Sequence, residues 1–271
     1  MTFTGHVDRF AEEHLPRPEL MPDLLFTLPE LRFPERMNAI EYFVDRHVHH
    51  GRGGRRCIVA PGGIDWTYED LYRASNRIAN VLVEDFSVVP GDRILLRAPN
   101  TPMLAACWVA ILKAGAIAVT TMPLYRSTEL AFMIGKAAVS LALCDKRLSD
   151  ELEAACAQEK NVPILYFKTD EEDGLEARMD AKRDEFKTVE TGAEDVAIIG
   201  FTSGTTGTPK AAMHYHRDLI ATCETYGRHV LQPHPDDLFC GSPPLAFTFG
   251  LGGLLLFPLY AGAATLLIEK A

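Results

Sequence analysis

A dense group of hydroxyl residues and glycines, Phe-Thr-Ser-Gly-Thr-Thr-Gly-Thr-Pro-Lys at residues 201–210, has the composition of a phosphate-binding loop. Its glycines can adopt backbone angles closed to other residues, so successive N–H groups can converge on an anion. The hydroxyl groups add short donors, and a lysine adds positive charge at the end. The predicted phosphate ligands are Thr202, Ser203, Gly204, Thr205, Thr206, Gly207, Thr208 and Lys210.

Two better-known nucleotide patterns do not fit this loop. In the P-loop pattern G-x-x-x-x-G-K-[ST], Gly204 would need a glycine at position 209, which is Pro209. No G-x-G-x-x-G follows an early predicted strand, so a Rossmann oxidoreductase lacks its fingerprint. A Ser/Thr-rich surface turn remains the alternative to phosphate binding.

The elements around the loop are strands followed by a helix. Residues 195–201 form an apolar run that predicts a buried strand, and residues 211–215 predict a short strand. A helix is expected from about residue 217 to residue 230. The loop should therefore connect two strands at one edge of a sheet.

Strands and helices alternate before the loop. Thr67-Tyr-Glu-Asp70 is a capping-box pattern, and Thr101-Pro102 supplies a cap and a first-turn proline for a helix that ends near Gly115. Alternation of this kind predicts an α/β fold, with layered parallel-type sheets flanked by helices. The remaining predicted strands are residues 93–98, 117–120, 140–144 and 164–167, and the remaining predicted helices are residues 127–138 and 149–159.

Composition divides the chain into three parts. Residues 1–56 are rich in proline and histidine and predict an N-terminal arm wrapped on a core, with a possible helix at residues 38–48. Residues 57–190 predict a first α/β lobe. A strongly charged segment, residues 168–191, predicts a solvated connection. Residues 191–271 would then begin a second lobe that carries the phosphate loop.

The overall composition is that of a globular protein and argues against several partners. The 271 residues are 47% hydrophobic and 24% charged, with a formal net charge of -10 and scattered basic residues, so nucleic acid is not expected as a partner. The six cysteines contain no C-x-x-C pair, which favours buried thiols in a reducing compartment. The N-terminus carries acids where a secretory signal needs an apolar core, so we expect a cytoplasmic protein.

An uncharged run at residues 249–268 has about the length of a membrane span. Five residues argue against a span because they should divide the run into a glycine turn, a short helix and a strand. Those residues are Gly250, Gly252, Gly253, Pro258 and Gly262. We therefore expect buried core here, and no membrane span.

Two histidine clusters, His47-Val-His-His50 and His214-Tyr-His216, have no cysteine or acid cluster at ligand spacing beside them. No protein metal site is predicted. His214 and His216 follow the phosphate loop, and a structural role in orienting its exit strand is the preferred interpretation.

The loop closely matches the signature [Thr/Ser]-Ser-Gly-Thr-Thr-Gly-x-Pro-Lys and so resembles the adenylate-forming superfamily of acyl- and aryl-CoA ligases, peptide-synthetase adenylation domains and luciferases. Other segments resemble the family in the same order: Trp66-Thr-Tyr-Glu-Asp-Leu71, Val89-Pro-Gly-Asp-Arg93, Leu112-Lys-Ala-Gly-Ala116, Pro123-Leu-Tyr-Arg126 and Lys210-Ala-Ala-Met-His-Tyr-His216. The resemblance covers nearly everything after about residue 40. It implies the N-terminal domain of an adenylate-forming enzyme.

The segment Ser242-Pro-Pro-Leu-Ala-Phe-Thr-Phe-Gly-Leu-Gly-Gly253 looks most like aryl-CoA ligases, especially those acting on benzoate or 2-aminobenzoate. The resemblance implies that Phe247, Phe249 and Gly250 line the acyl pocket. An aromatic wall suits a planar aromatic acid, since ring stacking adds about 0.5–1.5 kcal/mol beyond area burial. The alternative is that Phe247 and Phe249 are ordinary core residues.

The resemblance also implies a reaction and its co-substrates. A carboxylate attacks the α-phosphorus of ATP, pyrophosphate leaves, and the thiol of coenzyme A attacks the acyl-adenylate. The loop would restrain the β- and γ-phosphates, and Mg²⁺ would offset charge on the departing pyrophosphate. No covalent enzyme nucleophile is needed.

Family members continue beyond Ala271, and the magnesium-binding glutamate, the ribose-binding aspartate and the catalytic lysine all belong to that later part. The expectation from sequence is therefore an incomplete domain without a C-terminal domain, inactive by itself, with catalytic residues unassigned. A sheet without its neighbouring strands exposes edges, so self-association is also expected.

Two further hypotheses come from other functional classes. The chain could be a non-catalytic nucleotide-binding or interaction module that kept the loop, in which case adenine nucleotide would bind without carboxylate-dependent chemistry. A Rossmann oxidoreductase would instead require tight binding of a nicotinamide or flavin, and the sequence contains no feature that calls for one.

Overall fold

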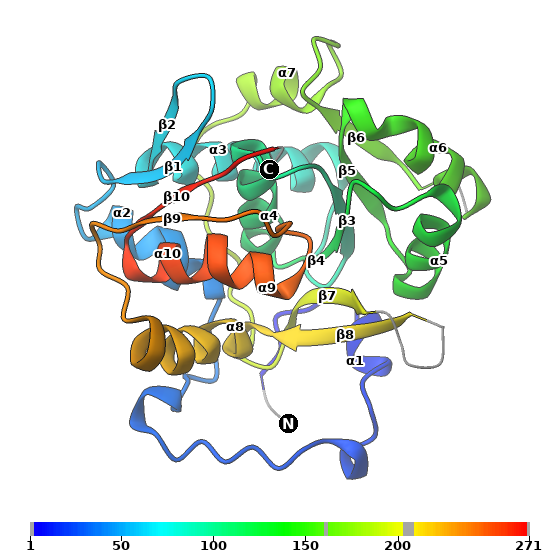
Figure 1. Ribbon diagram of the computed structural model, residues 1–271. Coiled ribbons are helices and arrows are strands. Elements are labelled where there is room, and N and C mark those ends of the chain that lie inside the picture. The colour runs from blue at the N-terminus through cyan, green and yellow to red at the C-terminus, as the bar shows by residue number, and fades with distance from the viewer. Residues whose placement is uncertain (1–2, 160–161, 203–208, 270–271) are drawn as a thin grey trace.

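The computed structural model describes residues 3–159, 162–202 and 209–269, and its strands form two sheets (Figure 1). The larger sheet has the strand order β6-β5-β3-β4-β7-β8 and is parallel except for β8, which runs antiparallel to β7. Its strands are β3 (Arg93–Arg97), β4 (Ile117–Thr121), β5 (Leu141–Asp145), β6 (Ile164–Phe167), β7 (Val196–Thr202) and β8 (Lys210–Tyr215). The predicted α/β architecture is confirmed.

A smaller sheet has the order β2-β1-β10-β9 and combines strands from residues 56–67 with strands from residues 238–266. Strand β1 pairs with β10 in parallel and with β2 as an antiparallel hairpin. The strands are β1 (Arg56–Ala60), β2 (Ile64–Thr67), β9 (Leu238–Cys240) and β10 (Ala264–Leu266). Each sheet takes strands from both sides of residue 190, so the expected division of the chain there does not coincide with a division between sheets.

The helices lie between the sheets and on their outer faces (Figure 1). Wide π-helical turns lengthen several of them: Glu41–Asp45 leads into α2, Val81–Asp85 continues α3, Cys223–Leu231 continues α8, and Gly252–Leu256 joins α9 to α10. Three short 3-10 turns lie at Pro18–Leu20, Pro29–Leu31 and Lys146–Leu148. The α-helices are α1 (Phe10–Glu13), α2 (Arg46–His49), α3 (Tyr68–Asn80), α4 (Pro102–Lys113), α5 (Ser127–Ala137), α6 (Ser149–Gln158), α7 (Leu175–Asp180), α8 (His216–Thr222), α9 (Thr248–Leu251) and α10 (Phe257–Ala261).

The predicted helix starts at Thr67 and Thr101 are confirmed by their capping hydrogen bonds. The Thr67 side chain accepts a hydrogen bond from the Asp70 backbone N–H, and Asp70 accepts one from the Thr67 N–H, which completes a capping box. At α4, the Thr101 hydroxyl accepts from the Leu104 N–H, 3.1 Å away, and Pro102 occupies the first turn. These caps satisfy backbone donors that a helix start leaves unpaired.

The apolar core divides at the large sheet. Because side chains alternate along a strand, Ile94 and Leu96 of β3 face the core shared with α4 and the small sheet, whereas Leu95 faces α5 and α6. Helix α4 therefore lies inside the molecule, and even Lys113 at its end is fully buried. The Lys113 ammonium is paired with Asp45 at 2.7 Å, which compensates a charge that would be costly to bury alone.

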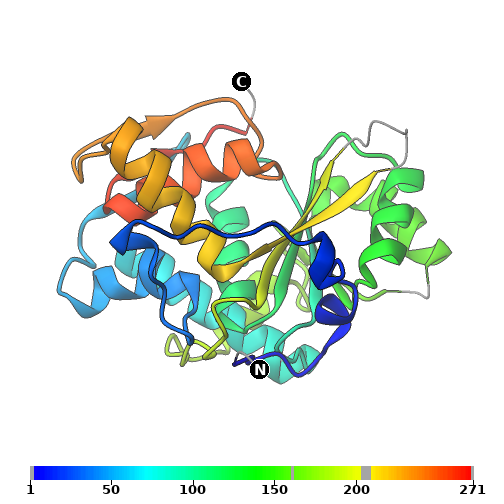
Figure 2. The same cartoon turned by 90° about the horizontal axis from the view of Figure 1, so that it is seen from below.

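The N-terminal residues run along the outside of the core. Figure 2 shows them crossing beneath β7 and β8 and running on to α8. They are held at their start because the backbone N–H groups of Val7 and Asp8 donate to the Pro90 carbonyl and the Gly5 N–H donates to Asp195. The Asp8 carboxylate also pairs with Arg93 at 2.7 Å.

One prediction about the C-terminal region is wrong. The glycines at 250, 252 and 253 do not form a turn but lie within one continuous helical segment that runs from α9 through α10. Burial of Leu251, Leu254 and Leu255 against the core outweighs the weak helix propensity of glycine. The helix ends at Gly262, which has a φ of 75° and forms the left-handed cap typical of glycine. No helix within the described ranges is both long and apolar enough to span a membrane.

Candidate active site

The two ends of the predicted phosphate loop are cross-strand partners. Thr202 at the end of β7 pairs with Lys210 at the start of β8, and both side chains are exposed. The other predicted phosphate ligands, Ser203, Gly204, Thr205, Thr206, Gly207 and Thr208, lie outside the described residues. The described part of the hairpin therefore fixes where the loop leaves the sheet and where it returns.

The loop leaves at the carboxyl edge of the large sheet. Strand β7 is parallel to β4, with Ile198 opposite Ala118 and Ile199 opposite Val119, and β4 is parallel to β3. Ligands of open α/β sheets bind outside the carboxyl ends of the strands. Thr202 thus belongs to the edge at which this architecture places ligand sites.

The predicted aromatic wall projects from the beginning of α9. Phe247 is the N-cap residue of this helix and its residue surface is 36% exposed, while Phe249 is 80% exposed. Neither ring is a core residue in this structure, so their exposure leaves them available to an aromatic ligand. Gly250, the third predicted pocket residue, is buried instead of lining the surface.

Gly250 is required by close packing. A Cβ atom at this position would lie 2.1 Å from the Pro244 carbonyl oxygen and 2.9 Å from the Pro243 carbonyl oxygen. Only glycine lets the helix approach the preceding proline segment this closely. Gly250 therefore allows the start of α9, which carries Phe249, to pack directly against Pro243 and Pro244.

Strand β7 and helix α9 are neighbours at this edge. A Cβ atom built at Gly200, two residues before Thr202, would lie 3.8 Å from the Cγ2 atom of Thr248. Thr248 stands between the two exposed phenylalanines in sequence. The start of the phosphate loop and the aromatic wall are thereby brought together, although about 40 residues of chain separate them.

Sequence reasoning missed the residues that hold the wall in place. The Asn100 Nδ2 donates to the Pro243 carbonyl at 3.0 Å, and its Oδ1 accepts from the Leu245 N–H at 2.9 Å. The Thr120 hydroxyl donates to the Ala246 carbonyl at 2.9 Å. The only local sign of Asn100 is a polar residue placed between a buried strand and a capped helix.

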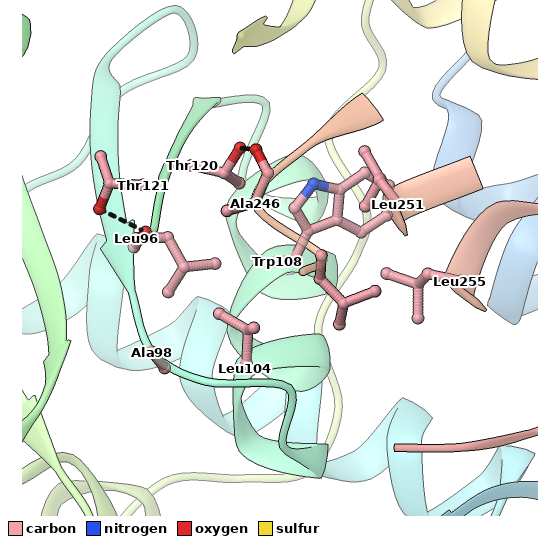
Figure 3. A pocket seen from close by; sticks show the side chains of 10 residues that line it. Leu96, Ala98, Leu104, Trp108, Thr120, Thr121, Ala246, Leu251 and Leu255 are labelled. Atoms are coloured by element: carbon pink, nitrogen blue, oxygen red, sulfur yellow. Dashed lines mark hydrogen bonds between the residues drawn. The ribbon is translucent and has the colours of Figure 1, made fainter. Parts of the chain in front are cut away.

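A small apolar cavity lies behind the wall (Figure 3). Its lining side chains nearly fill it, and they leave only about 10 Å³ that the centre of a water molecule could reach. The Trp108 ring occupies the centre of the lining side chains, and its Nε1 is buried without a hydrogen-bond partner in the described part of the chain. The lining residues are Leu96, Ala98, Leu104, Trp108, Thr120, Thr121, Leu245, Ala246, Leu251 and Leu255.

The histidines have structural positions. His216 is fully buried, its Nδ1 accepts from the Ala39 N–H at 3.1 Å, and burial lowers the pKa of its imidazole to about 3. The Nε2 of His47 donates to the Leu259 carbonyl at 2.8 Å, and burial lowers the pKa of His47 to about 4. His214 lies on β8 opposite Ile198. Within the described ranges, no three His, Cys, Asp or Glu side chains come together as a metal-binding group.

Comparison with known protein families gives one match. The family model described as AMP-binding enzyme matches residues 44–271. This range includes both sheets, the phosphate-loop segment and the aromatic wall.

The chain is also similar to individual proteins, in sequence and in fold. The benzoate–CoA ligase of Thauera aromatica is 28% identical over 245 residues, which are 90% of this chain and 46% of that enzyme. The crystal structure of the anthranilate CoA ligase AuaEII in complex with anthranoyl-AMP has the same fold, with a TM-score of 0.84 and 23% identity over 90% of this chain and 47% of that one. ATP-bound MatB from Rhodopseudomonas palustris has a TM-score of 0.77 and 26% identity over 87% of this chain and 46% of that one. The chain spans about half the length of the relatives it matches.

Proposed function

The chain belongs to the AMP-binding enzyme family, and from this premise we propose that it forms the ATP-phosphate and acyl sites of an acid–CoA ligase for an aromatic carboxylic acid. Benzoate and 2-aminobenzoate are the proposed substrates. The similar proteins named as benzoate–CoA and anthranilate CoA ligases support this choice. An aromatic acid is thus the substrate class that we add to the family membership.

One observation supports the proposal most: a Cβ atom built at Gly200 would lie 3.8 Å from the Cγ2 atom of Thr248, so strand β7 and helix α9 are close where the proposed loop and the proposed wall begin. A carboxylate whose ring stacks on Phe247 or Phe249 would then point toward a triphosphate bound at residues 202–210. Attack of a carboxylate oxygen on the α-phosphorus forms the acyl-adenylate and releases pyrophosphate. Holding both anions in line accounts for much of the rate enhancement in such a reaction.

The proposed roles divide between loop and wall. The backbone N–H and hydroxyl groups of residues 202–208 would bind the β- and γ-phosphates, and the Lys210 ammonium would offset their charge. Phe247 and Phe249 would orient the ring. Mg²⁺ is typically bound through substrate phosphates and one or two carboxylates, and the proposal assigns it no ligand among the described residues. Coenzyme A would take up the acyl group in the second half-reaction.

Carboxylate-dependent exchange of ATP with pyrophosphate tests this function. The purified chain would be assayed with Mg²⁺ and, in separate reactions, benzoate, 2-aminobenzoate and a medium-chain fatty acid. Because the chain spans about half the length of its relatives, we expect weak exchange or none from these 271 residues alone. Exchange that is strongest with an aromatic acid would support the assignment, and exchange only with the fatty acid would contradict the aromatic class.

A nucleotide-binding module without chemistry is the second candidate. The observation that keeps it in view is the hairpin with Thr202 opposite Lys210, which nucleotide binding alone would use. In this case ATP would bind, but added aromatic acid would change neither ATP affinity nor exchange. Cooperative binding of acid and nucleotide would reject it.

A further inference from the structure

We propose that Asn100 is a positioning residue that sets the aromatic wall for the carboxylic acid. The inference rests on the proposed function and adds to it a residue in the connection between β3 and α4. Asn100 is 6% exposed, so its amide is withdrawn from solvent. Both ends of that amide bind the same segment, residues 243–245.

The two prolines in this segment explain why a single asparagine can set the position of its backbone. Ser242-Pro-Pro-Leu245 has no backbone N–H at either proline, so Leu245 supplies the first donor after Ser242. Asn100 accepts from this donor at 2.9 Å and donates to the Pro243 carbonyl at 3.0 Å. Two bonds from one planar amide fix the position of the segment and also its rotation.

The remaining backbone groups link the segment to Phe247. The Thr120 hydroxyl binds the Ala246 carbonyl, and the Phe247 N–H donates to the Pro244 carbonyl at 3.1 Å. The Phe247 carbonyl accepts from the Leu251 N–H at 2.8 Å, inside the helical segment. A chain of hydrogen bonds therefore runs from Asn100 through the proline segment to the backbone of Phe247.

The helical segment from α9 to α10 is also held by apolar packing that does not involve Asn100. Leu251 and Leu255 of this helical segment, the wall helix (residues 248–261), face Leu104 and Trp108 across the space between them (Figure 3). Without the Asn100 bonds, the proline segment can move while the apolar core stays packed. A shift of about 1 Å in a positioning group can cost on the order of 100-fold in rate, so such motion would alter the fit of the acid more than the stability of the fold.

The test compares three variants of the whole chain. Asn100→Ala removes both bonds. Asn100→Asp keeps the acceptor for the Leu245 N–H but loses the donor to Pro243. Asn80→Ala is the matched control, because Asn80 is also buried and donates at 3.0 Å to two backbone carbonyls, those of Arg183 and Glu185, away from the wall.

The first measurement is binding of benzoate and of ATP, each by equilibrium dialysis. In Asn100→Ala we expect benzoate affinity to fall about tenfold while ATP affinity is unchanged, with Asn100→Asp between Asn100→Ala and the unmodified chain. Asn80→Ala should leave both affinities unchanged. Unchanged benzoate affinity in Asn100→Ala, or an equal loss for both ligands, would overturn the proposal.

The second measurement is amide hydrogen exchange in the free chain, which decides the matter even if the unmodified chain binds neither ligand and the proposed function fails. Asn100→Ala should speed exchange at Leu245 and Phe247 at least tenfold, with little change elsewhere, and Asn80→Ala should not. Unchanged exchange at these two amides, or a uniform rise across the chain, would show that Asn100 does not position the wall.

Discussion

Thr202 and Lys210 are cross-strand partners at the loop end of the β7–β8 hairpin, at the edge of the large sheet where its parallel strands have their carboxyl ends. This pairing fixes the separation between the two ends of residues 203–208. As directly opposed partners, the two residues carry their side chains on the same face of the hairpin. The arrangement suits an anion held between the loop and the lysine.

The role of Lys210 is tested by its removal. Lys210→Ala should weaken ATP binding about tenfold, because a charge-assisted contact to phosphate is lost. AMP binding should change little, since AMP lacks the β- and γ-phosphates. Calorimetric titration measures both affinities.

Lys136→Ala provides the charge-matched control, because Lys136 is exposed on α5. It should leave both affinities unaltered. Equal effects of the two substitutions would mean that only net charge matters and that Lys210 makes no specific phosphate contact.

The aromatic wall is tested at Phe247. Phe247→Ala should lower benzoate affinity about tenfold through lost ring stacking and lost apolar contact, together worth about 1.4 kcal/mol. The free energy of unfolding should change little because the ring is partly exposed. Tyr226→Ala, at another exposed aromatic residue, should leave benzoate affinity unchanged. Retained benzoate affinity in Phe247→Ala would remove this ring from the site.

Replacing two glycines of the wall helix by alanine should change the stability of the fold in different ways. Gly250→Ala should destabilise the fold by about 2 kcal/mol, because its Cβ would overlap the Pro244 carbonyl. Gly253→Ala should be neutral or stabilising by up to about 1 kcal/mol, because a Cβ there meets no atom within 4 Å and alanine favours a helix. Urea unfolding of both variants measures the difference. Equal effects would contradict the close packing described for Gly250.

Acid should destabilise the fold through His216. Burial lowers the pKa of this imidazole from 6.5 to about 3 in the folded chain, so the unfolded chain takes up the proton first as pH falls. Its contribution to stability is complete above pH 6.5 and is lost toward pH 3, by about 1.4 kcal/mol per pH unit.

The control for this effect is His216→Asn, whose side-chain oxygen can still accept from the Ala39 N–H. Urea unfolding at pH 7.5, 6.5 and 5.5 should show a shallower pH dependence for the variant than for the unmodified chain. Parallel pH profiles would mean that His216 is not kept neutral by burial.

Much of the fold could be predicted because the responsible signals are local. The apolar runs at β3 to β7 lie within a residue or two of their predicted bounds, and the caps at Thr67 and Thr101 gave the starts of α3 and α4. The helical conformation of Gly250, Gly252 and Gly253 was missed because its cause is not local. Glycine disfavours a helix by its own propensity, and here burial of the leucines between the glycines decides the conformation.

The candidate site could likewise be predicted where its signal is local and not where it depends on distant residues. The loop at residues 201–210 could be found from composition because its chemistry lies in consecutive residues. Asn100 could not, since its partners Pro243 and Leu245 are more than 140 residues away in sequence. The closeness of Thr248 to Gly200 likewise depends on how α9 lies against β7, which residues near in sequence do not determine.

The most direct test of the central claim compares the binding of ATP and AMP to the unmodified chain. If residues 202–210 bind the β- and γ-phosphates, ATP should bind at least about tenfold more tightly than AMP in the same titration, and added pyrophosphate should compete with ATP. Equal affinity for ATP and AMP, or no detectable binding of ATP, would contradict a phosphate site on this hairpin.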